Sequence, residues 1–262
     1  MKIHLEKHRI NGKFLYYAFV SGANQILEHQ SQINEINVFP VRDKDTGTNL
    51  ASTVRSVIDN IKPYKSYKKT ANSIAEMALM GARGNSGIIF AQFLYGANQE
   101  TPNKKTINLS EFADSIYKSI AYVYESVENP VEGTMLTVIK DWAEFIYSQK
   151  NSIGDFDLVL INSMEVLEKS LKETTTKLKA LNKSGLVDAG AKAFVLFVKG
   201  AIDFIKNRNI RKIVFRSTEK ISLIHTEKIT DEEIKYRFCT EAIIKNISQS
   251  KKELKSFLSK IG

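Results

Sequence analysis

Cysteine, proline and glycine are all scarce in this sequence of 262 residues, which contains one cysteine, four prolines and 13 glycines. The single cysteine, Cys239, excludes an internal disulfide framework and is typical of a reducing compartment. The shortage of proline and glycine favours long helices over an architecture that is rich in tight turns.

Long apolar runs are also missing. No stretch approaches the roughly 20 apolar residues that a membrane-spanning helix needs. The N-terminus, residues 1–13, is polar and lacks the apolar middle of a signal peptide. We therefore expect a cytoplasmic protein without a membrane span.

Acidic residues are in the minority, which gives a formal net charge of +9. The lysines and arginines are dispersed, and their three densest groups (62–69, 206–212 and 245–260) are not interleaved with aromatic residues. A base-stacking surface needs such interleaving. The charge therefore predicts a solvated, lysine-rich surface and no specific nucleic-acid binding, and it can also attract phosphate-bearing ligands or an acidic partner.

Apolar residues recur at helical spacing through most of the chain. This pattern predicts an all-α fold with helices at 14–36, 50–61, 70–80, 88–97, 110–127, 135–146, 158–181 and 189–205. After about Asn207 the pattern changes to short β-branched segments at 210–216, 221–226 and 236–244. We expect a helical domain over residues 1–207, and an incomplete β-containing central domain or linker over 208–262.

The loop Asn37–Asn49 carries two acidic residues, Asp43 and Asp45, between predicted helices. In an extended segment, residues two apart face the same side, and a glycine-assisted turn can have the same effect, so both carboxylates can converge on one cation. Mg²⁺ is usually held by one or two carboxylates together with substrate phosphates. The alternative interpretation is a solvated turn in which Thr48 or Asn49 caps the next helix.

A second loop, Gly81–Gly87, leads into a strongly apolar helix. Its three glycines allow backbone N–H groups to approach a phosphate, with the helix N-terminus behind them. No Gly-Lys-Ser/Thr follows and no strand precedes it, so the loop is neither a Walker A nor a Rossmann loop. It can equally be a corner where two helices pack closely.

Two further loops, 130–137 and 184–191, also combine glycine with one carboxylate before a helix. Asp188 in the second can be simply a helix N-cap. Because each of the four loops joins two predicted antiparallel helices, all four can gather at one end of a helical barrel.

In this order, the four loops resemble the signature loops of the dihydroxyacetone-kinase-like nucleotide-binding domain, specifically its fatty acid kinase branch. The segments that carry the resemblance are 37–49, 81–87, 130–136 and 187–191, and 236–241 resembles the start of that family's central domain. The resemblance implies an eight-helix antiparallel barrel that holds ATP or ADP and two Mg²⁺ ions at one end.

The resemblance also implies roles for individual residues. Asp43 and Asp45 are the catalytic metal ligands, Asn37 belongs to the same metal site, and Arg83 assists the transfer. Nucleotide-binding residues fall into a phosphate group and a nucleoside group, which are Thr48, Asn49, Gly84, Asn85 and Ser86, and then Thr134, Met135, Asp188 and Gly190.

In that family the substrate is a fatty acid presented by a fatty-acid-binding, DegV-like protein or domain, and the product is an acyl phosphate. A carboxylate nucleophile is already ionised, so catalysis reduces to positioning and charge neutralisation. A homodimer is left open.

Three alternatives remain. They are a kinase of a small polyol or ketone, a catalytically lapsed nucleotide-binding regulatory module, and a helical nucleic-acid binder. The second is motivated by Lys44, because the family usually has Pro-Asp-Gly-Asp where this chain has Arg42-Asp43-Lys44-Asp45. We expect Lys44 to point away from both carboxylates, as alternation along an extended segment dictates.

Overall fold

A computed structural model of the chain describes residues 9–40, 42–151, 156–207 and 248–258. The chain divides into two units, residues 1–221 and 222–262. In the second unit the structure describes one helix, α12 (Lys251–Leu258). The predicted strands at 210–216, 221–226 and 236–244 lie outside the described residues.

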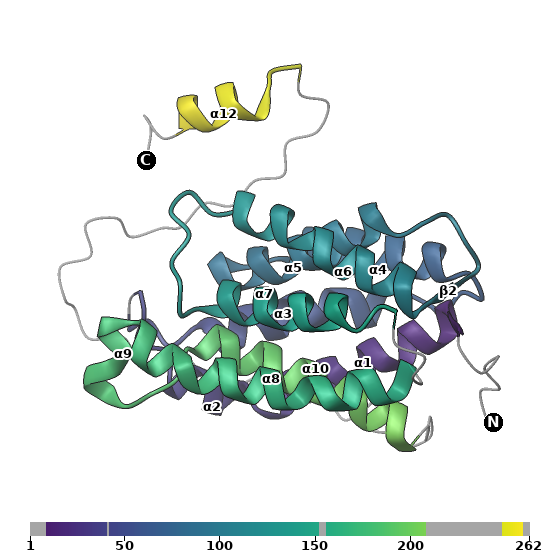
Figure 1. Cartoon of the computed structure of the whole chain (residues 1–262). Coiled ribbons are helices and arrows are strands. Elements are labelled where there is room, and N and C mark those ends of the chain that lie inside the picture. Colours follow the sequence, from purple (N-terminus) through teal and green to yellow (C-terminus); the bar gives the residue numbers. More distant parts are fainter. Residues whose placement is uncertain (1–8, 41, 152–155, 208–247, 259–262) are drawn as a thin grey trace. The chain divides into compact units, whose positions relative to one another are not determined.

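The first unit is a ring of antiparallel helices (Figure 1). Eight long helices form the ring, and two short helices, α2 (Gln30–Glu35) and α9 (Lys179–Ser184), lie between members of it. The eight are α1 (Gly12–Glu28), α3 (Thr46–Asn60), α4 (Tyr67–Gly81), α5 (Gly84–Glu100), α6 (Leu109–Glu125), α7 (Met135–Ser148), α8 (Phe156–Lys177) and α10 (Ala189–Asn207).

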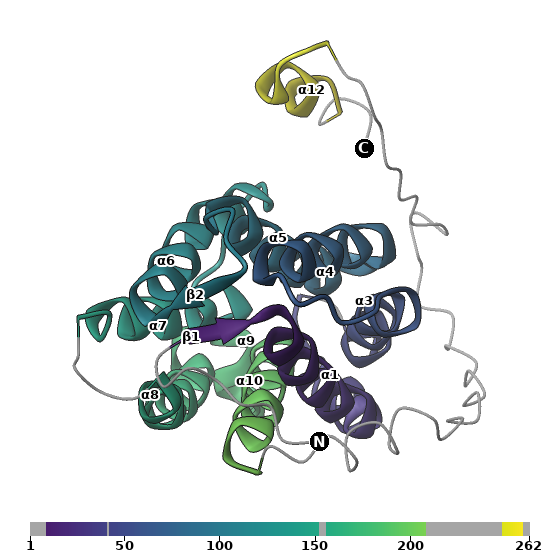
Figure 2. The same cartoon turned by 90° about the vertical axis from the view of Figure 1, so that its right-hand side faces the viewer.

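Neighbouring helices of the ring follow the order of the chain, as Figure 2 shows in a view down the barrel. Each packs against the next from α3 to α8, and the ring closes because α10 packs against both α8 and α1. The expected all-α, eight-helix antiparallel barrel is therefore confirmed. Among the described residues, no helix combines the length and the apolar composition that a bilayer crossing needs.

The core fills the inside of the ring with apolar and aromatic side chains. α10 is buried along most of its length, and Phe194 and Phe197 make edge-on contacts with Phe93 and Phe90 of α5. α1 and α10 pack very closely, since a Cβ on Gly22 would lie 2.5 Å from the backbone oxygen of Phe197. Tight packing of this kind fixes the helix ends, and with them the loops.

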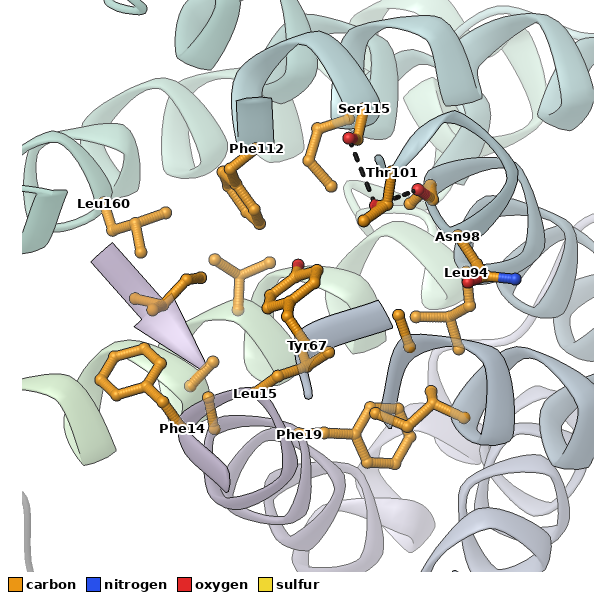
Figure 3. A pocket seen from close by; sticks show the side chains of 18 of the residues that line it. Phe14, Leu15, Phe19, Tyr67, Leu94, Asn98, Thr101, Phe112, Ser115 and Leu160 are labelled. Carbon is orange, nitrogen blue, oxygen red and sulfur yellow. Dashed lines mark hydrogen bonds between the residues drawn. The ribbon is translucent and has the colours of Figure 1, made fainter. Parts of the chain in front are cut away.

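A cavity of about 130 Å³ lies inside the barrel, near the end where α1, α4, α6 and α8 begin. Its lining is apolar apart from a few residues, which include Tyr67, Asn98, Thr101 and Ser115 (Figure 3). Thr101 Oγ1 donates to Ser115 Oγ at 3.3 Å. Asn98 Oδ1 is buried and makes no hydrogen bond within the described part of the chain. This cavity lies at the opposite end of the helices from the four predicted loops.

Two features of the helices differ from the prediction. The expected helix 14–36 is broken at His29, where the imidazole Nδ1 lies 2.9 Å from the backbone oxygen of Gln25. That carbonyl also accepts the His29 N–H, so the side chain competes with the helical bond at this position. Likewise, the expected helix 158–181 is divided at Leu178 into α8 and α9.

A small antiparallel sheet was not predicted. β1 (Arg9–Asn11) pairs with β2 (Thr106–Asn108) across the start of the ring. The Arg9 guanidinium donates from Nε to Thr106 Oγ1 at 2.9 Å and forms an ion pair with Glu111 at 3.4 Å. The sheet joins the beginning of α1 to the beginning of α6.

Candidate functional site

The connection between α2 and α3 holds two carboxylates, and an asparagine amide contacts each. Asn37, which is buried, donates from Nδ2 to Asp43 Oδ1 at 2.7 Å. Asn49, in the first turns of α3, donates from Nδ2 to Asp45 Oδ2 at 2.8 Å. The two aspartates are thus held from opposite ends of the loop by amide donors.

The two carboxyl groups lie close enough to interact. Partial burial raises the pKa of Asp45, and the charge of Asp43 raises it further, while the hydrogen bond from Asn49 acts in the opposite direction. Two like charges in a half-buried loop repel each other, and a cation between them would remove that repulsion. The two carboxyl groups thus lie close together, and their joint binding of a cation stays a prediction.

Lys44, between the two aspartates, adopts a left-handed backbone conformation with φ 54°. The expected extended alternation is therefore wrong, because a left-handed residue turns the chain instead of continuing it. The Lys44 side chain is exposed. Glycine adopts this conformation at little steric cost, whereas a residue with a Cβ is strained in it.

The second predicted loop packs directly against the first. Gly84 has φ 56°, and a Cβ at this position would lie 2.4 Å from Asn49 Nδ2, the atom that donates to Asp45. A Cβ on Gly87 would lie 2.6 Å from Thr53 Oγ1. The glycines of this loop thus allow α5 to approach α3 closely, so both the packing and the phosphate interpretations remain compatible with them.

The first turn of α5 supplies backbone N–H groups beside Asn49, which donates to Asp45. α5 begins at Gly84, and its N-cap residue Arg83 makes no side-chain capping bond. Arg83 and Asn85 are exposed and Ser86 is half-buried. A helix N-terminus carries partial positive charge and favours an anion.

The third and fourth loops form a second joined pair. Asp188 is buried and accepts hydrogen bonds from the backbone N–H of Ala191, at 2.8 Å, and of Met135. A Cβ on Gly190 would lie 2.9 Å from Met135 Cε. Burial raises the pKa of Asp188 to about 6, although both hydrogen bonds act to lower it. Asp188 thus caps α10 and fastens it to α7.

Of the four residues predicted around the nucleoside, the structure leaves one partly accessible. Thr134 is half-buried and donates from Oγ1 to the backbone oxygen of Val131 at 2.7 Å. Met135 and Asp188 are buried, and Gly190 lies against Met135. Their predicted nucleoside contacts therefore stay predictions, with a structural role already visible for each.

All four loops lie at one end of the barrel, the left-hand end in Figure 1. Successive helices of the ring alternate in direction, so the connections that follow α2, α4, α6 and α9 share that end. α10, which follows the fourth loop, also contacts α2 and α3, which flank the first. This loop end is the candidate site.

Sequence reasoning assigned no role to two groups of polar residues at the loop end. Gln30 and Asn34 of α2 hydrogen-bond to Thr48, as described below. In the third loop, Glu132 accepts from Thr137 Oγ1 at 2.5 Å and from the Tyr124 hydroxyl at 2.9 Å. Burial acts to raise the pKa of Glu132, but these hydrogen bonds outweigh it and lower the pKa. The four-residue spacing of Gln30 and Asn34 on one helix face was the available signal.

The residues at the loop end fit Mg²⁺ as a partial set of oxygen ligands. Within the described segments, no group of three or more histidine, cysteine, aspartate or glutamate side chains could hold a metal alone. Two interacting carboxylates are an incomplete set of oxygen ligands. Such a set suits Mg²⁺, because this ion keeps several positions for water and substrate phosphates.

Comparisons with known proteins connect this site to a family. A model of the DAK2 domain matches residues 40–203. Protein YloV of Bacillus subtilis is 32% identical over 254 residues, which cover 93% of this chain and 45% of that protein. An uncharacterized protein of Staphylococcus saprophyticus is 31% identical over 244 residues, which cover 90% of this chain and 44% of that protein.

Solved structures show the same fold. The dihydroxyacetone kinase of C. freundii, in its native form, matches 78% of this chain with a TM-score of 0.55 and 16% identity, over 37% of its own chain. The same enzyme in complex with AMP-PNP and Mg²⁺ gives a TM-score of 0.54 over 36% of its chain. This chain spans slightly less than half the length of the curated relatives named above.

Proposed function

Because this chain belongs to the DAK2 domain family, we propose that it binds ATP or ADP with Mg²⁺ at the loop end and transfers a phosphoryl group. We propose further that the acceptor is a fatty acid carboxylate, presented by a DegV-like partner, and that the product is an acyl phosphate. Family membership supports a kinase-like nucleotide domain, and the resemblance of the loops to the fatty acid kinase branch supports the choice of acceptor.

The observation that carries the proposal is a pair of carboxylates, each of which is held in place by an asparagine side chain. Asp43 and Asp45 interact with each other, and each accepts a hydrogen bond from an asparagine on a neighbouring segment. Hydrogen bonds from two amides keep the carboxylates in place, while their mutual repulsion remains. Among the described residues of this loop, no ion pair neutralises either carboxylate.

The neighbouring α5 completes a site for phosphate groups. Its first turn lies against Asn49, the residue whose side chain donates to Asp45. Bound Mg²⁺ would neutralise charge on the transferred phosphoryl group. Arg83, exposed at the same turn, can add positive charge on the outer side.

A carboxylate acceptor agrees with the residues that the loops contain. A fatty acid is ionised at neutral pH, so its attack on phosphorus needs no general base. None of the four loops contains a histidine. The work of this chain would then be to position the phosphates and exclude water, which is the main contribution of enzymes to phosphoryl transfer.

The left-handed Lys44 favours a second candidate, a nucleotide-binding regulatory module without catalysis. The lysine brings a positive charge between the two proposed metal ligands, at a position where the resemblance to the family implies glycine. A lysine amine near both carboxylates would compete with Mg²⁺. In this candidate, nucleotide binding persists and transfer is lost.

A transfer assay separates the two candidates. The chain is incubated with ATP, Mg²⁺ and a DegV-like protein loaded with fatty acid, and acyl phosphate is trapped with hydroxylamine. We expect product with the wild type and none with Asp45→Asn. The control Asp59→Asn removes an exposed carboxylate at the other end of α3 and should leave the rate unchanged. Nucleotide binding without product from the wild type would favour the regulatory module.

A further inference from the structure

Helix α3 begins without a cap from its own N-cap residue. An aspartate at this position ordinarily accepts a hydrogen bond from the N–H of the second or third residue of the helix. Asp45 is the N-cap residue of α3, yet its side chain makes no such bond. Its Oδ2 instead accepts from the Asn49 side chain.

The missing cap comes from another helix. Thr48 is the third residue of α3, and its backbone N–H donates to Asn34 Oδ1 at 3.1 Å. Asn34 belongs to α2, on the other side of the loop that carries the aspartates. The amide oxygen of Asn34 thus caps α3 in place of the Asp45 carboxylate.

The same asparagine also sets the direction of the Thr48 hydroxyl. Asn34 Nδ2 donates to Thr48 Oγ1 at 3.0 Å, and Gln30 Nε2 donates to the same atom at 3.2 Å. A hydroxyl has two acceptor sites and one hydrogen. With both acceptor sites occupied, the hydroxyl of Thr48, an exposed residue, can act toward a ligand only as a donor.

The close approach of α2 to α3 depends on the glycine before Thr48. A Cβ on Gly47 would lie 2.3 Å from the backbone oxygen of Gln30 and 2.7 Å from Asn34 Oδ1. Any larger residue would therefore push α2 away and break the bonds to Thr48. Gly47 is therefore needed for the close packing of α2 against α3, and not only for the flexibility of the turn.

We propose that Asn34 is a positioning residue for the Mg²⁺–nucleotide site. By capping α3 in place of Asp45, it leaves the Asp45 carboxylate available to the cation. Together with Gln30, it also presents the Thr48 hydroxyl as a donor to a phosphate oxygen. This inference rests on the proposed function, because it assigns Asn34 to the same site.

The first arm of the test identifies which side chain, Asn34 or Asp45, accepts the hydrogen bond from the Thr48 backbone N–H. Amide hydrogen exchange of Thr48 is followed by NMR in the ligand-free protein. In Asn34→Ala, Asp45 is expected to rotate and take over the cap, so that the Thr48 amide stays protected. In Asn34→Ala combined with Asp45→Ala, protection should fall at least tenfold, because no capping side chain remains. Equal protection of the Thr48 amide in the two variants would show that Asp45 does not replace Asn34 as the cap, and would overturn the inference.

The second arm measures ligand affinity by calorimetric titration of ADP in the presence of MgCl₂. Asn34→Ala should weaken binding roughly three- to thirtyfold, the range that corresponds to a helix cap that must be broken before the cation binds. The matched control is Asn108→Ala, which removes the cap of α6, where Asn108 accepts from the Glu111 N–H at 2.9 Å. It should lower the melting temperature similarly and leave the ADP affinity within twofold.

The outcomes distinguish this inference from the proposed function. If Asn34→Ala only lowers the melting temperature, as Asn108→Ala does, Asn34 is a structural residue and the inference is wrong. If the wild type fails to bind ADP with Mg²⁺, the proposed function itself fails and the positioning role fails with it. The exchange measurement still decides in that case whether Asn34 and Asp45 compete for the cap.

Discussion

Replacing Lys44 with glycine should stabilise the protein, although the substitution removes a side chain and adds backbone freedom. Lys44 has φ 54°, and among the described residues it is the one position other than glycine with positive φ. A left-handed conformation costs a residue with a Cβ about 1–2 kcal/mol. Glycine removes this cost but gains conformational entropy in the unfolded chain, which offsets about 0.5–1 kcal/mol.

The net gain expected for Lys44→Gly is therefore about 0.5–1 kcal/mol in the free energy of unfolding. In a helical unit of this size that gain raises the melting temperature by roughly 1–4 °C. Urea unfolding followed by far-UV circular dichroism measures it as a higher midpoint with an unchanged slope. The matched control is Lys65→Gly, an exposed loop position without positive φ, which should lose about 0.5–1 kcal/mol.

A loss of stability in Lys44→Gly equal to that of Lys65→Gly would refute the reasoning, because it would show that the left-handed conformation carries no strain. The same variant also reports on function. We expect its affinity for Mg²⁺ and nucleotide to change only modestly, since the Lys44 side chain is exposed. Appearance of transfer activity in Lys44→Gly, from an inactive wild type, would favour the regulatory module.

Three further predictions concern stability. Gly84→Ala should cost about 2 kcal/mol or more and weaken Mg²⁺–ADP binding, because φ is 56° and the new Cβ would meet Asn49 Nδ2 at 2.4 Å. Gly185→Ala, with φ 68° and no atom within 4 Å, should cost only about 1 kcal/mol. Equal losses of stability in Gly84→Ala and Gly185→Ala would show that the contact with Asn49 adds no cost. The pKa of Asp188, about 6, lies above its ordinary value of 3.8, so its protonation favours the folded state. The stability of the wild type relative to Asp188→Asn should rise as the pH falls from about 7 to about 4, by up to about 3 kcal/mol, and a flat difference in urea midpoints would contradict this. A chain that ends at residue 207 should unfold cooperatively by circular dichroism, because the whole ring precedes that point, and loss of the transition would refute an independent helical unit.

The ring of helices could be predicted because its signals are local. Helical spacing of apolar residues marked each long helix, and the resemblance of four short loops supplied the barrel. The pairing of β1 with β2 had no such signal, since three-residue strands nearly 100 positions apart have no periodicity to detect. The break at His29 was missed for a related reason, because a side chain that competes for a helical carbonyl looks like any other polar residue.

At the candidate site, the sequence predicted which residues gather and could not predict how each is held. Asp43 and Asp45 lie close together because the chain turns at a left-handed Lys44, a conformation that no propensity of lysine favours. The cap of α3 by Asn34 joins two helices through a side chain, and an ordinary capping pattern requires neighbours in the chain. The described roles of Asp188 are those of a helix cap, which its position before α10 had already indicated.

The most direct test of the account is the position of a metal ion at the loop end. Crystals of the chain grown with ADP and Mn²⁺, which binds similar oxygen ligands to Mg²⁺ and scatters anomalously, would locate the ion. The account predicts an anomalous peak within about 2.3 Å of carboxylate oxygens of both Asp43 and Asp45, with the phosphates at the first turn of α5. A nucleotide bound elsewhere, or an ion that touches neither aspartate, would contradict it.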